Sequence, residues 1–137
     1  DEIQFEEGFI FINNEKINRE KIKKNNILRC GKFSFEVNSF VETLPNGIKY
    51  TAAYNKNGTM MNTQKFKVPE NHFFLLGDNR DCSRDSRFLD SVGYVNIINL
   101  VGKAQIIFFS NDTVKGSVLK FWNLKNSFRI DRLFKRI

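Results

Sequence analysis

The stretch Leu44-Pro45-Asn46-Gly47-Ile48-Lys49-Tyr50-Thr51-Ala52-Ala53-Tyr54 decides the fold class of this chain. Its Asn-Gly pair is a turn signal, because these residues tolerate a positive φ at low cost. Beyond the turn, apolar or aromatic residues fill every second position from 48 to 54, which is the period of a half-buried strand. Upstream, residues 33–37 alternate in the same way. The two segments therefore predict a β-hairpin.

The rest of the body repeats the strand pattern. Residues 3–12 predict another hairpin, which turns at Glu6-Glu7-Gly8. The Lys- and Asn-rich residues 13–26 predict a surface connection with room for one helical turn. Because no helix of crossover length precedes residue 110, we expect an all-β fold of mainly antiparallel sheets. Further strands are predicted at 65–68, 72–76, 92–95 and 101–109, with the apolar runs at 72–76 and 106–109 buried on both faces.

The composition of the chain bounds its class. Its 137 residues fit one domain, and 15 Phe with 41% hydrophobic residues exclude a disordered chain. No apolar run approaches the roughly 18 to 20 residues of a membrane-spanning helix. The sequence opens at Asp1, without Met, inside a predicted strand, so we expect an upstream part to be missing. Cys30 and Cys82 are too few for a disulfide framework and lack zinc-site spacing, which leaves their redox state open.

The positive charge is concentrated at the carboxy-terminal end. Residues 115–137 hold seven basic residues and one acidic residue, a net +6 of the chain's +7. We therefore divide the chain into a β-rich body, 1–114, and a basic tail, 115–137. A nucleic-acid-binding domain would be expected to spread its charge over a face of the fold instead. The apolar residues Ile130, Leu133, Phe134 and Ile137 have the spacing of a short amphipathic helix.

Two interpretations of this tail remain open. Its aromatic and basic side chains would suit attachment to an anionic membrane surface, where apolar burial and Lys/Arg attraction add. A tail packed on the body with its charges solvated would produce the same pattern. The candidate membrane-surface residues are Phe121, Trp122, Phe128, Arg129, Arg132, Phe134, Lys135 and Arg136.

The chemistry of the chain is concentrated in Gly77-Asp78-Asn79-Arg80-Asp81-Cys82-Ser83-Arg84-Asp85-Ser86-Arg87, directly after an apolar run. Three interpretations compete. A metal site on the carboxylates of Asp78, Asp81 and Asp85 is disfavoured, because the spacing is not that of a calcium loop and neighbouring Arg side chains would repel a cation. A Cys82 nucleophile with His72 as its base needs a proximity that ten residues do not establish. A self-satisfied turn of ion pairs is the strongest of the three.

The same stretch resembles the last conserved box of the type I signal peptidases, membrane-bound Ser/Lys proteases that remove leader peptides from exported proteins. Every fixed position of Gly-Asp-Asn-Arg-Asp-x-Ser-x-Asp-Ser-Arg is present. The flanking Val68-Pro69-Glu70 and the segment from Gly93 through Ala104 are also similar to that family, and residues 1–17 resemble the stretch after its Lys box. One departure is the spacing, since residues 88–92 precede Gly93 where some relatives reach the Gly sooner.

The resemblance implies a signal-peptidase-like β fold and a role for each residue of the box. A Lys acts as a base only when burial keeps it neutral, and it must be held in place. Ser83 is implied to be the hydroxyl that orients this Lys, and Asp85 with Arg87 the ion pair that supports it. Cys82 and Arg84 fall on variable positions of the box. Loop architecture is implied for Gly77, Asp78, Asn79, Arg80, Asp81 and Ser86.

The resemblance also implies what this chain lacks. The family's nucleophilic Ser, its Lys base and its membrane anchor lie upstream of the position matching Asp1, so we expect a fragment that is inactive alone. The implied partners are the signal peptides of exported preproteins, and the implied place is the periplasmic face of a bacterial inner membrane. No cofactor, metal or nucleic acid is expected. The alternative is a non-catalytic β-domain that binds an anionic membrane surface or nucleic acid through its tail.

Overall fold

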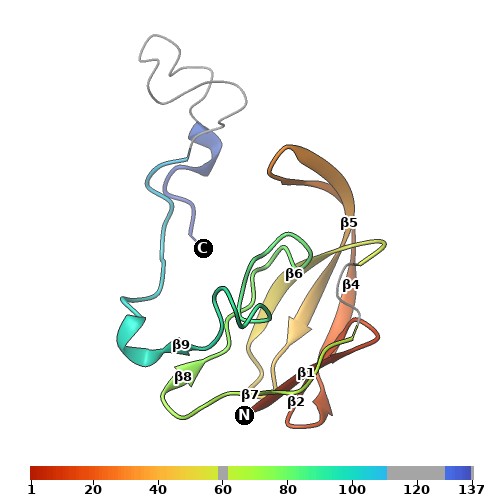
Figure 1. The fold of residues 1–137 in the computed structure, drawn as a ribbon. Helices are drawn as coiled ribbons and strands as arrows, with labels where there is room; N and C mark the ends of the chain where they lie inside the picture. Colours follow the sequence, from red (N-terminus) through yellow and green to blue (C-terminus); the bar gives the residue numbers. More distant parts are fainter. Residues whose placement is uncertain (59–61, 111–128, 137) are drawn as a thin grey trace. The chain divides into compact units, whose positions relative to one another are not determined.

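Two compact units follow each other along the chain in the computed structural model (Figure 1), Asp1–Leu100 and Val101–Ile137. The structure describes residues 1–58, 62–110 and 129–136, and for residues 23–26 it describes the backbone alone. Within these ranges the regular elements are β-strands and short 3-10 helices, so the prediction of an all-β, mainly antiparallel fold is confirmed. None of the helices in the described part of the chain has the length and apolar character needed to cross a membrane. The predicted boundary at 114/115 lies outside the described residues and stays a prediction.

A four-stranded sheet with the order β3-β2-β1-β7 carries the hydrophobic core of the Asp1–Leu100 unit. β1 (Glu2–Glu6) and β2 (Phe9–Ile12) form the hairpin predicted for residues 3–12. Their turn places Glu7 and Gly8 at positive φ, 49° and 73°. β3 (Glu15–Lys16) pairs with β2, and β7 (Phe66–Lys67) pairs with β1. The buried core consists of Ile3, Phe5, Ile10, Ile17 and Phe66.

A three-stranded antiparallel sheet with the order β4-β5-β6 carries the rest of the unit. β4 spans Asn18–Cys30, β5 Phe33–Thr43 and β6 Lys49–Asn55. β5 and β6 are the hairpin predicted from the Asn-Gly turn. In that turn Gly47 has φ 82° and its amide donates to the carbonyl of Leu44 at 2.8 Å. The Asn-Gly signal therefore predicted the connection correctly.

The prediction that residues 13–26 form a surface connection is wrong. They contain β3 and the first part of β4, which pairs with β5 from Asn18 opposite Thr43 to Cys30 opposite Phe33. The pairing shifts register between Ile22 and Asn26. A backbone ladder satisfies the amide and carbonyl groups whatever the side chains are, so this polar segment forms a strand without apolar alternation.

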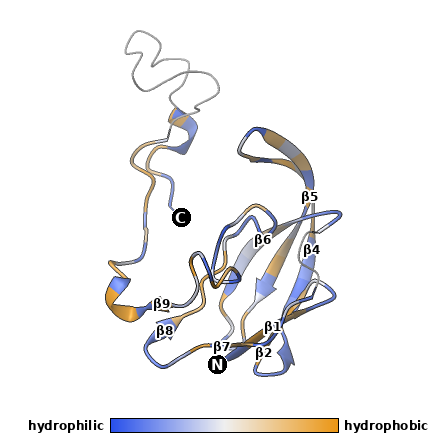
Figure 2. Ribbon diagram, viewed as in Figure 1, coloured by the Kyte–Doolittle hydropathy of each residue, from blue (hydrophilic) through white to orange (hydrophobic). Residues whose placement is uncertain are grey.

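The apolar run at 72–76 is only partly strand, and it is not buried on both faces as predicted. β8 (His72–Phe73) pairs antiparallel with β9 (Val95–Asn96) in a two-stranded sheet. Phe74 and Leu76 pack against the core, whereas Phe73 and Leu75 are exposed, because only one side of the segment faces the core. The 3-10 helix η1 (Ile97–Asn99) follows β9, and its exposed isoleucines stand out as a hydrophobic segment in Figure 2.

The described part of the Val101–Ile137 unit forms no regular sheet, contrary to the strand predicted at 101–109. Ile106 makes an isolated antiparallel bridge to Arg136, and Phe108 is exposed rather than buried. η3 (Ile130–Arg132) is one 3-10 turn. Phe134 then adopts φ 56° and donates its amide to the carbonyl of Ile107 at 2.7 Å, so the amphipathic helix predicted over 130–137 is absent from residues 130–136. Three tail candidates lie outside the described residues: Phe121, Trp122 and Phe128.

Candidate functional site

The residues Gly77–Arg87 form a loop that runs beside β6 (Figure 1), and we call it the site loop. The amide of Ala53 in β6 donates to the carbonyl of Asp78 at 2.8 Å, and the amide of Arg80 donates to the carbonyl of Ala53 at 2.9 Å. These bonds form a parallel bridge between Ala53 and Asn79. The site loop is therefore fastened to the edge of the β4-β5-β6 sheet.

The two ends of the site loop are also fastened to each other. The amide of Leu75 donates to Oγ of Ser86 at 2.9 Å, and the amide of Ser86 donates back to the carbonyl of Leu75 at 3.0 Å. Next to this pair, the amide of Gly77 donates to Oδ2 of Asp85 at 2.9 Å. The residues between Gly77 and Asp85 are thus held in a closed loop.

Asp85 and Arg87 form a buried, two-pronged ion pair. Nε and Nη2 of Arg87 donate to the two carboxylate oxygens of Asp85 at 2.8 and 2.9 Å. Burial alone would disfavour the charged carboxylate, but the hydrogen bonds from Arg87 and from the Gly77 amide outweigh it and lower the pKa of Asp85. Arg87 also donates to the carbonyl of Arg80, and its guanidinium lies 5.5 Å from the ring centroid of Phe5. The ion pair expected from the sequence therefore also anchors the site loop to the core.

The side chain of Ser83 lies directly against Gly77. A Cβ built on Gly77 would be 2.1 Å from Oγ of Ser83 and 2.3 Å from its Cβ, so only glycine permits this approach. The amide of Ser83 donates to the carbonyl of Asn79 at 2.8 Å, which fixes its backbone. Within the part of the chain that the structure describes, the Ser83 hydroxyl has no hydrogen-bond partner, and its residue is partly exposed. The hydroxyl thus packs against Gly77 and is open to a further hydrogen bond as far as the described residues are concerned.

A second buried ion pair, between Arg80 and Glu42 of β5, was missed at the sequence level. Nη2 of Arg80 lies 2.6 Å from Oε2 of Glu42, and these side chains are only 2% and 0% exposed. Nε of Arg80 donates to the carbonyl of Gly77 at 3.0 Å, so the pair acts on the backbone against which Ser83 packs. A possible signal was that a buried Arg requires a carboxylate, but nothing in the sequence identified Glu42 as that carboxylate.

Two tyrosines of β6 complete the surroundings of the buried pair. The hydroxyl of Tyr54 donates to Glu42 and accepts from Nη1 of Arg80 at 3.1 Å. Burial raises the pKa of Tyr50 to about 12, and the negative charge of Glu42 adds to the effect. Burial likewise raises the pKa of Tyr54. Both phenols therefore stay protonated at neutral pH, and Tyr54 can act as a donor.

The remaining polar residues of the site loop bind backbone groups. Oδ1 of Asp78 accepts from the amide of Asn79 at 2.9 Å, and Oδ2 of Asp81 accepts from the amide of Asn55 at 2.7 Å. Oδ1 of Asn79 is buried without a hydrogen-bond partner among the described residues. Each carboxylate has its own backbone or Arg partner, so Asp78, Asp81 and Asp85 do not form a common ligand site. Across residues 1–58, 62–110 and 129–136, no group of three or more His, Cys, Asp and Glu is placed to hold a metal ion.

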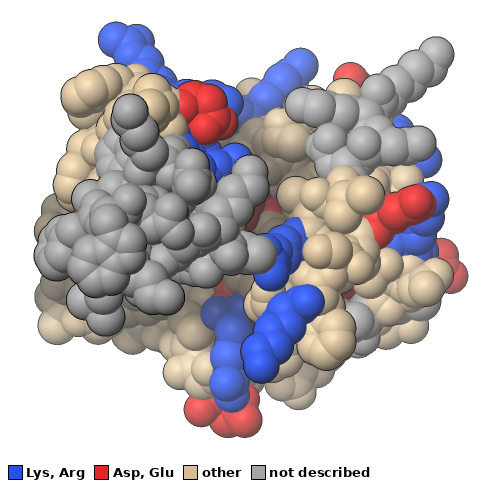
Figure 3. All heavy atoms as spheres, turned by 90° about the horizontal axis from the view of Figure 1, so that it is seen from above, with Lys and Arg blue, Asp and Glu red and all other residues tan. Residues whose placement is uncertain are grey.

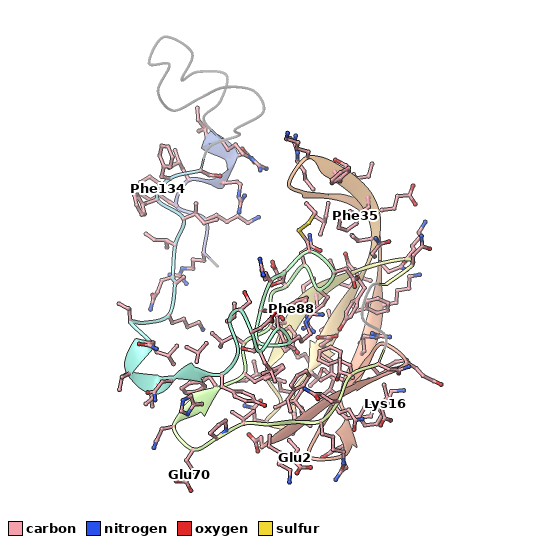
Figure 4. The ribbon with its side chains drawn as sticks, viewed as in Figure 1. Glu2, Lys16, Phe35, Glu70, Phe88 and Phe134 are labelled. Carbon is pink, nitrogen blue, oxygen red and sulfur yellow. A yellow bond between two sulfur atoms is a disulfide. The ribbon has the colours of Figure 1, made fainter. Side chains whose placement is uncertain are left out.

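Cys82 is joined to Cys30 at the end of β4 by a disulfide, with a Cα–Cα distance of 5.6 Å. Figure 4 shows this bond in yellow between the site loop and the hairpin that carries Phe35. Cys82 has no free thiol, so its interpretation as a nucleophile with His72 is wrong for this structure. Nδ1 of His72 instead lies 2.7 Å from the carbonyl oxygen of Glu70. The redox state left open by the sequence is resolved as a disulfide.

An apolar cavity of about 400 Å³ lies at the neck of the site loop. Ile3 and Ile10 of the core sheet form part of its wall, and the run from Phe73 to Leu76 forms another part. Tyr50 and Arg80 also line it. The cavity therefore adjoins the polar network that supports Ser83.

The residues between the site loop and Gly93 form a closed turn. The carbonyl of Phe88, labelled in Figure 4, accepts from the amides of Ser91, Val92 and Gly93 at 3.0, 3.1 and 3.1 Å. Gly93 has φ 57°, and a Cβ there would lie 3.1 Å from the carbonyl oxygen of Leu89. Residues 88–92, which make the distance from the site loop to Gly93 longer than in some relatives, thus form this turn.

The family model and the relatives that match this chain are all signal peptidases. The family model described as signal peptidase, peptidase S26, matches residues 1–109. Signal peptidase I of Rickettsia typhi is 36% identical and that of Rickettsia prowazekii 35% identical to this chain; each match covers 100% of this chain and 55% of the relative. Signal peptidase I of Rickettsia bellii is 34% identical, with 100% and 50% covered. The chain spans about half the length of these relatives. No solved structure gives a significant match.

Proposed function

Because this chain belongs to the signal peptidase family, peptidase S26, we propose that it supplies the supporting part of the catalytic site of a type I signal peptidase. In this proposal a serine nucleophile and a lysine base from outside the 137 residues form a Ser/Lys dyad. The dyad cleaves signal peptides from exported preproteins. The 137 residues alone are therefore expected to have no peptidase activity.

The observation that carries this proposal is the position of the Ser83 hydroxyl. A lysine amine is long and flexible, so it acts as a base only when it is held and kept neutral. Ser83 packs against Gly77 without clearance, and its hydroxyl has no partner among the described residues. A hydroxyl held in this way can accept a hydrogen bond from a lysine amine and orient it. We assign Ser83 this positioning role.

The charges around Ser83 support the same role. A free carboxylate beside the lysine would stabilise its ammonium form and remove the base. The carboxylate of Asp85 is instead occupied by two bonds from the Arg87 guanidinium and by the Gly77 amide. In our proposal, Asp85 and Arg87 hold the loop while presenting no unpaired negative charge to the lysine.

The disulfide supports an extracytoplasmic position for this part of the protein. Disulfides such as Cys30–Cys82 form and persist in oxidising compartments, which in bacteria include the periplasm. We therefore propose that these residues lie on the periplasmic face of the inner membrane. Attachment to the membrane surface through the tail remains part of the proposal, and among its described candidates Arg129, Phe134, Lys135 and Arg136 are exposed.

The proposal is tested by measuring preprotein cleavage with two forms of the protein. The 137-residue chain alone should show no turnover, whereas an extended protein, in which a segment that carries the proposed serine and lysine precedes the 137 residues, should cleave. Within the extended protein, Ser83→Ala should lower kcat by about 100-fold, because orienting and proton-transfer groups typically contribute that much. Ser83→Thr should restore part of the rate.

The matched control is Ser91→Ala, because Ser91 is exposed in the turn that follows the site loop. It should leave kcat unchanged. Turnover by the 137-residue chain alone would show that the nucleophile and base are misassigned. An extended protein whose Ser83→Ala variant is fully active would remove the positioning role of Ser83.

A further inference from the structure

The disulfide joins the site loop to a distant strand directly beside Ser83. Cys82 immediately precedes Ser83 in the chain, and its partner Cys30 is the last residue of β4. The amides of Cys82 and Ser83 both donate to the carbonyl of Asn79, at 3.1 and 2.8 Å, so the two residues share one turn of the loop. A displacement of Cys82 therefore also moves the backbone of Ser83.

At the other end of the disulfide, Cys30 lies in a part of the β4–β5 hairpin that has little support. β6 ends opposite Val37 of β5. In the described part of this sheet, residues 27–30 and 33–36 then pair only with each other, and Figure 1 shows this ribbon extending beyond β6. Two strands alone are only marginally stable. The disulfide is therefore a covalent link between a weakly supported ribbon and the site loop.

The surroundings of the disulfide suit cleavage by a thiol. Both cysteines are partly exposed, and neither belongs to the hydrophobic core. Residues 21–35, which include Cys30, hold five basic residues and no acidic residue. Figure 3 shows Lys and Arg side chains, in blue, projecting from the face that it presents. Because positive charge stabilises a thiolate, Cys30 is favoured as the sulfur that leaves when the bond breaks.

We propose that the Cys30–Cys82 disulfide is a reversible redox site whose oxidised form holds Ser83 in its working position. The modifying partner is a dithiol reductant. One thiolate of the reductant attacks Sγ of Cys82, the S–S bond breaks, and the thiolate of Cys30 leaves. The second thiolate of the reductant then attacks the reductant's own sulfur in this mixed disulfide and releases Cys82. The protein gains two electrons and two protons, and the reductant leaves as a disulfide.

The consequence for Ser83 rests on the proposed peptidase function. The bond from the Gly77 amide to Asp85 and the Asp85–Arg87 ion pair hold the base of the site loop in both redox states. Reduction releases the part of the loop next to Ser83. A misplacement of about 1 Å can lower a rate about 100-fold. Because the base of the loop stays anchored, we expect a smaller loss in kcat, about tenfold.

Such a site makes peptidase activity depend on the compartment. The disulfide forms and persists where conditions are oxidising. A protein in a reducing compartment would therefore keep a loosened site loop and cleave slowly, and oxidation would bring it to its full rate.

The first test follows the site loop in the 137-residue chain and requires no peptidase activity. Dithiothreitol is added to the folded chain, and alkylation with mass spectrometry should detect both cysteines as free thiols. Hydrogen exchange should then become about tenfold faster at the amides of Cys82 and Ser83. The matched control is the pair of amides of Ser91 and Val92, which bond to the carbonyl of Phe88 and should not change. Reoxidation with oxidised glutathione should restore slow exchange.

The second test measures preprotein cleavage by the extended protein, at a temperature where circular dichroism shows both redox forms to be folded. Reduction should lower kcat about tenfold, and reoxidation should restore it. The acidic limb of the pH profile of kcat should move to higher pH on reduction, because a loosened loop admits water that stabilises the ammonium form of the lysine. A loss of folded protein would instead scale the whole profile. Cys30→Ala/Cys82→Ala should show the lower rate with and without dithiothreitol.

Three results would overturn the proposal: a disulfide that dithiothreitol leaves intact in the folded chain, unchanged exchange at Cys82 and Ser83 after reduction, or a reduced extended protein with the rate and pH profile of the oxidised form. An oxidised extended protein that does not cleave would remove the proposed peptidase function. In that case the exchange measurement would still decide whether the disulfide holds the site loop.

Discussion

Replacing Glu42 with Gln leaves the guanidinium of Arg80 buried without its counter-charge. The two groups are 2.6 Å apart in the native protein, and their side chains are 0% and 2% exposed, so water cannot replace the lost carboxylate. Removing one partner of such a pair costs about 3–5 kcal/mol, because the remaining charge stays desolvated. Single domains are stable by only about 5–15 kcal/mol. We therefore expect this substitution to remove a large share of the stability of the Asp1–Leu100 unit.

Urea unfolding measures this loss. The three tyrosines, Tyr50, Tyr54 and Tyr94, all belong to the Asp1–Leu100 unit, so near-ultraviolet circular dichroism in the tyrosine band follows this unit once Trp122, which absorbs in the same range, is replaced by Phe in every variant. With a slope of about 2 kcal/mol per molar urea, the midpoint of the Glu42→Gln variant should fall by about 1.5–2.5 M. Tyr54→Phe keeps the ion pair and removes the hydroxyl that donates to Glu42 and accepts from Arg80, so it should cost about 1–3 kcal/mol.

The matched control is Glu36→Gln on the same strand. Glu36 pairs with Lys56, but both side chains are largely exposed, 65% and 50%. Exposed ion pairs contribute little, so the urea midpoint should not change measurably. A Glu42→Gln loss of less than about 1 kcal/mol, or one no larger than that of the control, would refute the reasoning from burial.

Three further changes test the site loop itself. Gly77→Ala forces a Cβ into the side chain packed against it and should cost about 1–3 kcal/mol by overpacking, whereas Gly102→Ala, which meets nothing within 4 Å, should leave the urea midpoint unchanged. The pKa of Asp85 is lower in the folded protein than its ordinary value of 3.8, so the ionised carboxylate stabilises the fold fully above pH 3.8 and this stability is lost as the pH falls through the folded pKa. Asp85→Asn should therefore flatten the dependence of the urea midpoint on pH below pH 3.8. Reducing the Cys30–Cys82 disulfide, whose partners are 52 residues apart, should lower the free energy of unfolding by about 2–4 kcal/mol. A Cys30→Ala/Cys82→Ala variant whose urea midpoint still falls on addition of reductant would contradict this.

The features that could be predicted from the sequence are those with local signals. Alternation and the Asn-Gly turn indicated the β5–β6 hairpin, and the same reasoning found β1 and β2. The Asp85–Arg87 ion pair is local as well, since its partners are two residues apart. Each of these depends on the period of an extended chain or the chemistry of a turn, which a short window of residues records.

The features that could not be predicted depend on partners far away in the chain. Glu42 and Arg80 are 38 residues apart, and Cys30 and Cys82 are 52 apart. The polar first part of β4 is a strand because β5 lies beside it, which its own residues do not reveal. The apolar run at 72–76 shows the same limit, because its composition does not tell which of its sides faces the core.

The closed turn after the site loop makes the protein tolerant of changes in length. Phe88 and Gly93 meet through one carbonyl, so residues 89–92 leave and rejoin the fold at nearly the same point. Additional residues grafted there need not move either the ion pair before the turn or β9 after it. This position therefore suits a small peptide tag or a fluorescent label placed close to the site, and it offers a natural place for family members to differ in size.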